Sequence, residues 1–204
     1  MLMTEFETFL EELENTSPSV QYGWSKEKEK SCDWLINRIQ RKTRGVDIGG
    51  TEYICRKLQE KGCDPVYYDK TDPPKTITSF IKDDMENVLA HFPERSLDWI
   101  TTRHTLEHCL LPLFQLWAYN RLLKDNGHLF VIVPSHSRDW VWFETHHNCL
   151  PHDNWVMLFY RAGFKIEEAD AGTWWAKNHR FIEYRYRLSV ETRNLRMGKP
   201  ENPI

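Results

Sequence analysis

The sequence predicts an α/β fold in which helices cover both faces of a central, mostly parallel sheet. The clearest pattern lies in residues 97–134, where apolar segments at 97–102 and 128–133 flank a segment with leucines at helical spacing. Continuous apolar segments are typical of parallel strands buried on both faces. Pro112 is suited to the first turn of the helix between them, and Asn126–Gly127 to its end. These residues predict a βαβ unit, and such units bind ligands at the carboxyl ends of their strands.

The rest of the chain supplies further strands at regular intervals, separated by helices. Short apolar and β-branched segments are bounded by glycine, proline or aspartate, as expected of strands between turns. The predicted strands are 45–48, 65–68, 76–81, 165–168 and an antiparallel strand near the sheet edge at 181–188, and the predicted helices are 4–14, 25–38, a helix ending at Lys61, and 153–161.

Length favours one main domain. A chain of 204 residues can bury a full hydrophobic core, and we expect that core within residues 44–192. The two helices within residues 1–43 would cover the ligand pocket or pack at the sheet edge. Residues 193–204 form a polar tail.

Composition excludes several classes of protein. With 27 basic and 30 acidic residues the net charge is −3, which gives no electrostatic reason to expect a nucleic-acid partner. Neither a long apolar segment nor a secretory signal is present, so we expect no membrane association and a cytoplasmic location. The five cysteines are scattered and never form a C-x-x-C pair, which argues against disulfides and zinc ribbons. The sequence carries no signal for an oligomeric state.

A glycine turn follows the first strand of the main domain. Asp47-Ile48-Gly49-Gly50 precedes a helix, and a strand, glycine turn and helix in this order bring backbone amides close to a ligand. Asp69 lies 22 residues after Asp47, at the end of the next strand. A carboxylate in this place can accept hydrogen bonds from both hydroxyls of a ribose. The pattern therefore predicts a ligand that contains adenosine.

The βαβ unit resembles one known family. Asp98, Leu106-Glu107-His108, the segment from Arg121 to Gly127 and a strand ending at Pro134 resemble the class I S-adenosylmethionine-dependent methyltransferases of the type 11, small-molecule group. The resemblance covers about residues 44–168. It implies a Rossmann-like class I methyltransferase fold, S-adenosylmethionine as cofactor, and methyl transfer to an unidentified, small-molecule acceptor.

The resemblance also assigns roles to residues at the strand ends. Asp84 and Met85 match the family's third motif, which contacts adenine. The first motif is usually D-x-G-x-G-x-G, but Thr51 and Tyr53 stand here in place of its second and third glycines. No metal ligand is implied. The expected cofactor-binding residues are Asp47, Gly49, Gly50, Asp69, Asp84, Met85 and Thr102.

Three alternative functions remain open at this point. The departures at Thr51 and Tyr53 are compatible with an inactive, methyltransferase-like binding or scaffold protein. His104-Thr-Leu-Glu107-His108 matches H-x-x-E-H, the zinc signature of a class of metallopeptidases. That chemistry needs both histidines on one helix, whereas here the motif directly follows a strand. A nicotinamide-dependent dehydrogenase rests on Asp69 alone.

His104 is the candidate catalytic residue. It lies just beyond the end of the strand at 97–102, where the family places residues that face the methyl group. The unperturbed pKa of imidazole, about 6.5, suits removal of a proton near neutral pH. His136, after the next strand, is the rival candidate, and a role for His104 in capping the following helix or in the pocket wall is equally compatible.

Overall fold

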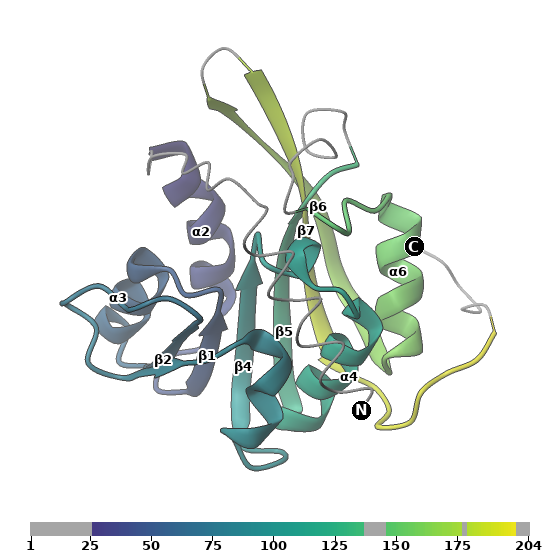
Figure 1. The fold of residues 1–204 in the computed structure, drawn as a ribbon, viewed down its shortest axis with the longest axis horizontal. Coiled ribbons are helices and arrows are strands. Elements are labelled where there is room, and N and C mark those ends of the chain that lie inside the picture. Colours follow the sequence, from purple (N-terminus) through teal and green to yellow (C-terminus); the bar gives the residue numbers. More distant parts are fainter. Residues whose placement is uncertain (1–25, 137–145, 177–178, 199–204) are drawn as a thin grey trace, which may run out of the picture.

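A seven-stranded sheet forms the centre of the protein, and the computed structural model describes residues 26–136, 146–176 and 179–198 (Figure 1). The strands are β1 (Arg44–Ile48), β2 (Asp64–Asp69), β3 (Phe80–Lys82), β4 (Leu97–Arg103), β5 (Leu123–Pro134), β6 (Phe164–Ala176) and β7 (His179–Val190). Their order is β3-β2-β1-β4-β5-β7-β6. β1 to β5 pair in parallel, and β7 pairs antiparallel with β5 and β6. The predicted sheet with an antiparallel closing strand is confirmed.

Helices cover both faces of this sheet. The helices are α2 (Lys26–Arg38), α3 (Glu52–Glu60), α4 (Pro112–Leu122) and α6 (His152–Arg161), with short 3-10 helices η1 (Met85–Ala90) and η2 (Leu106–His108). Figure 1 shows α2 and α3 on one side of the sheet, and α4 and α6 on the other. Because successive strand residues point to opposite faces, Phe130 and Ile132 pack with the α2 side while Leu129 and Val131 pack with the α4 side.

The end of α4 differs from the prediction. The helix ends at Leu122, before Asn126–Gly127, and β5 begins at once with Leu123. Leu123 is buried and pairs with Leu97, after which the register shifts to pair Trp99 with His128. The start of β4 therefore pairs with the first residue of β5, directly after the end of α4. Asn126–Gly127 lies instead at this irregularity within β5.

The third strand is shorter and later than predicted. β3 contains only residues 80–82, not 76–81. Ile77 donates its backbone N–H to the Pro74 carbonyl in a turn, and its side chain packs against Cys55 and Tyr67. Ile77 therefore fills the space beside α3 rather than forming a ladder. At the other edge, β6 extends well beyond the predicted 165–168, and β7 lies between β5 and β6.

The N-terminal and C-terminal segments are described only in part. The predicted helix at 4–14 lies outside the described residues, whereas α2 closely matches the predicted 25–38. α2 is joined to β6 by Arg38, which binds both carboxylate oxygens of Glu168 at 2.8 and 2.5 Å. In the polar tail, Arg193 donates hydrogen bonds to the Leu123 carbonyl and to Asp125. These contacts fasten the first part of the tail to the start of β5.

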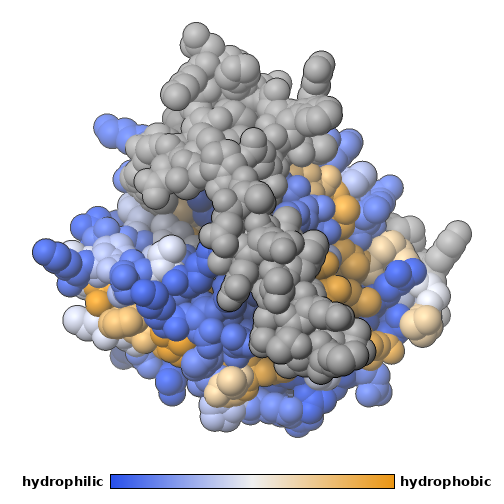
Figure 2. Space-filling model, viewed as in Figure 1, coloured by the Kyte–Doolittle hydropathy of each residue, from blue (hydrophilic) through white to orange (hydrophobic). Residues whose placement is uncertain are grey.

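No helix in the described part of the chain is long and apolar enough to cross a membrane. On the face seen in Figure 2 the described surface is mostly hydrophilic, and hydrophobic residues gather toward the side of α4 and α6. Leu111 and Phe114, at the start of α4, are exposed.

Candidate functional site

The carboxyl ends of β1, β2 and β4 lie side by side and carry most of the predicted cofactor-binding residues. Ile48, near the end of β1, pairs with Tyr68 of β2 and with Thr102 of β4. Gly49 and Asp69 follow directly on these neighbouring strands. The sheet thus brings together residues that lie far apart in the sequence, at the edge where α/β folds bind ligands.

Asp47 is the buried centre of this edge. Its carboxylate accepts a hydrogen bond from the Thr101 hydroxyl at 2.6 Å and another from the Thr51 backbone N–H at 2.7 Å. Burial raises the pKa of Asp47 to about 7, although both hydrogen bonds favour the ionised form. Asp47 is fully buried, so the described contacts assign its carboxylate to holding the turn between β1 and α3.

The glycine turn is shaped by the protein's own packing. The backbone N–H groups of Gly49 and Gly50 both donate to the Tyr68 carbonyl, at 2.9 and 3.1 Å, so they are not directed at a ligand as expected. Gly49 has a φ of +77°, and a Cβ there would lie 2.0 Å from the Thr105 hydroxyl oxygen. A Cβ on Gly50 would lie 2.4 Å from the Tyr67 ring. A larger side chain at either position would therefore disturb the turn before it met any ligand.

The two non-glycine positions of the first motif have structural partners. The Thr51 backbone is extended, with a φ of −120°, a conformation open to any residue. Tyr53 donates its hydroxyl hydrogen bond to Asp33 of α2 at 2.9 Å. The third glycine position of the family motif is thus occupied here by a residue that ties α3 to α2.

Asp69 ends β2 with one carboxylate oxygen available. Its Oδ1 accepts hydrogen bonds from the backbone N–H and the hydroxyl of Thr71, at 2.8 and 2.7 Å. No described residue donates a hydrogen bond to Oδ2. The side chain is partly exposed, beside the glycine turn. This arrangement leaves Asp69 able to accept a hydrogen bond from a ligand hydroxyl.

The acidic segment after β3 contains two different carboxylates. Asp83 has a structural role, and Asp84 is exposed. Asp83 accepts hydrogen bonds from Asn87 and from the Asp84 backbone N–H, and it pairs with His91 at 2.7 Å. Asp84 is exposed, and Met85 is partly buried against the core. Asp83 therefore orders the segment that carries Asp84 and Met85, the two residues predicted to contact adenine.

The end of β4 carries an unsatisfied hydroxyl. Thr102 is fully buried, and its Oγ1 has no hydrogen-bond partner among the described residues. Buried hydroxyls are rarely left unpaired in folded proteins, so such a group invites a ligand or water partner. Thr105, two residues beyond β4, instead donates to the Ile48 carbonyl at 3.1 Å and closes the turn.

His104 lies between two buried carboxylates. Its Nε2 is 3.1 Å from Glu183 of β7, and its Nδ1 is 3.5 Å from Glu107 of η2. Burial and the charge of Arg103 lower the pKa of His104, but the two carboxylates outweigh them and raise it above its ordinary value of 6.5. Arg185 also binds Glu183, at 2.8 and 2.9 Å. The two carboxylates therefore stabilise the protonated imidazole relative to that of a free histidine.

This geometry differs from that of an H-x-x-E-H metallopeptidase. His104 has a φ of +50° and precedes η2, so it is not on one continuous helix with His108. Both of its ring nitrogens face carboxylates. The arrangement that this zinc signature requires is not formed.

The sequence indicates no site role for Glu183, and it presents His146 only as one of four loop histidines, for which simple exposure is the expected explanation. Glu183 approaches His104 from β7, 79 residues away in the sequence. His146, from the loop before α6, lies 4.0 Å from Glu107. No local pattern signals either contact, because the first depends on how β4 and β7 come together across β5, and the second on how the loop before α6 lies against η2. His136, the rival base, is exposed and lies 3.1 Å from the Tyr184 hydroxyl.

Comparison with known proteins identifies the same type of fold. A family model described as a methyltransferase domain matches residues 21–169. A search of curated proteins gave no match.

Three of the solved structures that share this fold come from one bacterium and two archaea. A candidate methyltransferase from Bacillus halodurans C-125 has a TM-score of 0.66 at 13% identity and covers 80% of this chain and 100% of its own. A SAM-dependent methyltransferase from Methanosarcina mazei has a TM-score of 0.64 at 12% identity, covering 77% and 96%. A candidate methyltransferase from Haloferax volcanii, solved in complex with the Trm112 methyltransferase activator, has a TM-score of 0.67 at 14% identity, covering 81% and 91%.

The first prediction concerns the stability supplied by Glu183. Although burial raises the pKa of Glu183, its hydrogen bond and ion pair with His104 lower it to about 2, from an ordinary value of 4.5. A depressed carboxyl pKa stabilises the fold above pH 4.5, and this stabilisation is lost as the pH falls toward 2. Between pH 5 and 3 the difference in unfolding free energy between the parent and Glu183→Gln should shrink by about 2 kcal/mol. Urea unfolding at each pH measures it.

The matched control is Glu60→Gln, which removes an exposed carboxylate paired only with nearby basic residues. Its difference from the parent should stay nearly constant over the same range, because exposed ion pairs contribute little to stability. Equal pH dependence in the two variants would contradict the role assigned to Glu183.

Proposed function

The chain belongs to the methyltransferase domain family, whose cofactor is S-adenosylmethionine, and from this premise we propose that it transfers the methyl group to a small-molecule acceptor. The observation that carries the proposal is Asp69, whose Oδ2 lies available at the end of β2 beside the glycine turn. A strand-end carboxylate in this position suits a ribose. The unpaired, buried Thr102 hydroxyl gives the same edge a second group that fits a polar ligand.

The cofactor would lie across the ends of β1, β2 and β4. We assign Asp69 to the ribose hydroxyls and Asp84 with Met85 to the adenine. The turn at Gly49 and Gly50, held in place by Asp47, would support the rest of the cofactor together with Thr102. When bound, the cofactor supplies an electrophilic methyl group on a sulfonium. The protein's contribution is to hold the acceptor close and in line with it.

His104 is our proposed catalytic residue. Its side chain is 16% exposed, just beyond β4, and both ring nitrogens face carboxylates, so an acceptor would take the place of the more distant partner, Glu107, at Nδ1. We assign it to hydrogen bonding with the acceptor, and to taking up a proton where the acceptor must lose one. Because Glu107 and Glu183 raise the pKa of His104, they favour the protonated imidazole over the neutral one, which suits the hydrogen-bonding role more than the uptake of a proton.

A binding or scaffold protein without catalysis is the second candidate function. Thr51 and Tyr53 in the first motif favour it, and so does the turn, whose amides are already bonded within the protein. Calorimetric titration with S-adenosylhomocysteine and with the nicotinamide cofactors would separate a methyltransferase from a dehydrogenase. A screen of phenols, amines and thiols for release of S-adenosylhomocysteine would separate an enzyme from a scaffold.

Asp69→Ala should weaken binding of S-adenosylhomocysteine at least about tenfold. Two hydrogen bonds to a charged acceptor are each worth about 1.5–3 kcal/mol before non-additivity. The dissociation constant measured by calorimetry tests this, with circular dichroism as a check on folding. The matched control is Thr71→Val, which removes the same local hydroxyl bond but keeps the carboxylate. An equal loss of affinity in both variants would assign Asp69 to the loop rather than to the ligand.

His104→Asn should lower turnover at least about tenfold while the dissociation constant for S-adenosylhomocysteine stays within about threefold. Asparagine is chosen because it tolerates the positive φ at this position. The control is His136→Asn, the rival after β5. Turnover is measured with an acceptor found in the screen. Near-parental turnover in His104→Asn would show that His104 is not catalytic and that catalysis depends on positioning of the acceptor alone. A loss of turnover only in His136→Asn would assign the catalytic role to His136.

A further inference from the structure

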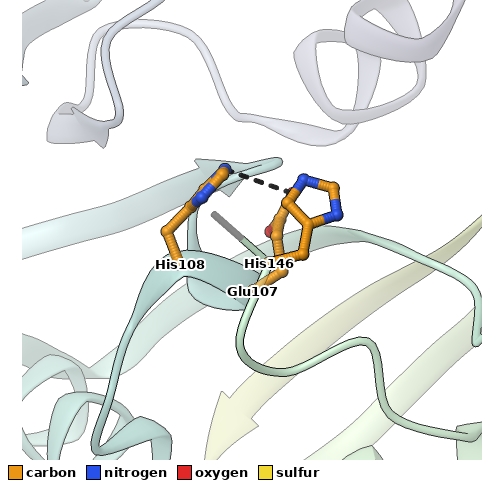
Figure 3. Close-up of side chains that lie close together, drawn as sticks. All are labelled: Glu107, His108 and His146. Carbon is orange, nitrogen blue, oxygen red and sulfur yellow. Dashed lines mark ion pairs between the residues drawn. The ribbon is translucent and has the colours of Figure 1, made fainter. Parts of the chain in front are cut away.

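We propose that Glu107, His108 and His146 form a binding site for one divalent transition-metal ion of the zinc type. Figure 3 shows the two imidazole rings and the carboxylate close together. Glu107 and His108 lie on η2, and His146 lies on the loop before α6. The site does not depend on the proposed methyl transfer. It also departs from the sequence-based expectation that the chain has no metal ligands.

The buried carboxylate of Glu107 is the observation that calls for an ion. The side chain is 0% exposed, yet neither carboxylate oxygen has a hydrogen-bond partner among the described residues. The imidazole nitrogens of His104, His108 and His146 lie 3.5, 4.0 and 4.0 Å away, too far for good hydrogen bonds. A buried charge without hydrogen bonds costs several kcal/mol. A bound cation would remove that cost directly.

The three ligand atoms are almost at the spacing that a metal requires. They all lie within 4.8 Å of one another. In a tetrahedral zinc site, bonds of about 2.1 Å place the ligand atoms about 3.4 Å apart. Each side chain would need to move by less than about 1 Å to reach that geometry. Rotations of the two imidazole rings, whose centroids are 4.8 Å apart, would supply part of this movement.

The backbone already holds the two ligand-bearing segments together. The Glu107 carbonyl accepts hydrogen bonds from the backbone N–H groups of His147 and Asn148, at 2.7 and 2.9 Å. The Asn148 side chain also donates to the Cys109 carbonyl. The other ring nitrogen of His146, Nδ1, lies 3.4 Å from the Cys149 thiol, so a neighbouring group can fix the ring orientation. The site is therefore largely formed before an ion arrives.

The donor set determines the kind of ion and what it can do. Two imidazoles with one carboxylate suit Zn²⁺, Co²⁺ or Ni²⁺ rather than Mg²⁺ or Ca²⁺, which prefer oxygen ligands. Three protein ligands leave one tetrahedral position for water or for an atom of a bound molecule. His104 remains outside the ligand set, since it pairs with Glu183 on its other side. This distinguishes the site from an H-x-x-E-H zinc centre.

Metal binding by the tag-free protein tests the proposal. After dialysis against a chelator, the parent should bind one Co²⁺ per chain with the visible absorption of a four-coordinate ion, and Zn²⁺ should displace it. His108→Asn and His146→Asn should each raise the dissociation constant for Zn²⁺ at least about tenfold, because each removes one of three ligands. Circular dichroism confirms folding, and using two histidine variants avoids reliance on the buried Glu107.

The matched control is His147→Asn, which changes an exposed neighbouring imidazole and keeps the backbone N–H that bonds to Glu107. It should bind the ions as the parent does. The proposal is overturned if the folded parent binds neither Co²⁺ nor Zn²⁺. It is also overturned if His108→Asn and His146→Asn bind Zn²⁺ with the same affinity as the control His147→Asn. Binding of S-adenosylhomocysteine is measured on the same metal-free protein. If the metal-free protein does not bind S-adenosylhomocysteine, the proposed function is overturned, whereas the proposed metal site is unaffected.

Discussion

The buried carboxylate of Asp47 is the constraint on which the ligand-binding edge depends. It lies where β1 ends and joins β4, through Thr101, to the start of α3, through Thr51. A carboxylate buried in this way is tolerated only because both of its oxygens are hydrogen-bonded, and losing either partner would leave a costly unpaired group. The same junction fixes the glycine turn, whose amides reach across to Tyr68 on β2. Three strand ends are thereby held in one arrangement, and the position of Asp69 beside the turn follows from it.

A second group of buried charged residues lies beyond the end of β4, and its two carboxylates differ in how well they are hydrogen-bonded. Glu183, His104 and Glu107 come from β7, the end of β4 and η2, so no single element can form the group. Glu183 is well satisfied, since Arg185 and His104 both bind it. Glu107 is not, because its nearest imidazoles lie beyond good hydrogen-bonding distance. The contrast between the two carboxylates shows that burial alone does not decide whether a charge is structural. The number and distance of its partners decide it.

Much of the fold followed from local patterns, whereas the site followed from them only in part. Residues 97–134 predicted a βαβ unit because burial on both faces leaves an apolar signature in the sequence itself. The end of α4 was predicted wrongly at Asn126–Gly127, because the pairing of Leu123 with Leu97 starts β5 before this local stop signal is reached. The segment at 76–81 has β-branched residues, but Ile77 fills a gap beside α3 instead. The contacts of Glu183 and His146 could not be placed from the sequence, since the first crosses β5 in the sheet, the second joins a loop to η2, and neither leaves a spacing pattern.

The departures from the glycine motif can now be judged by their physical causes. Glycine is needed where φ is positive or where a Cβ would collide, and both conditions hold at Gly49. Neither backbone condition holds at Thr51, whose extended conformation suits any residue. Tyr53 lies within α3 and uses its hydroxyl to hold α2. The conformation of the turn is therefore compatible with both residues. The case for an inactive protein then rests on the volume of these two side chains and on the turn amides, which are bonded to the Tyr68 carbonyl.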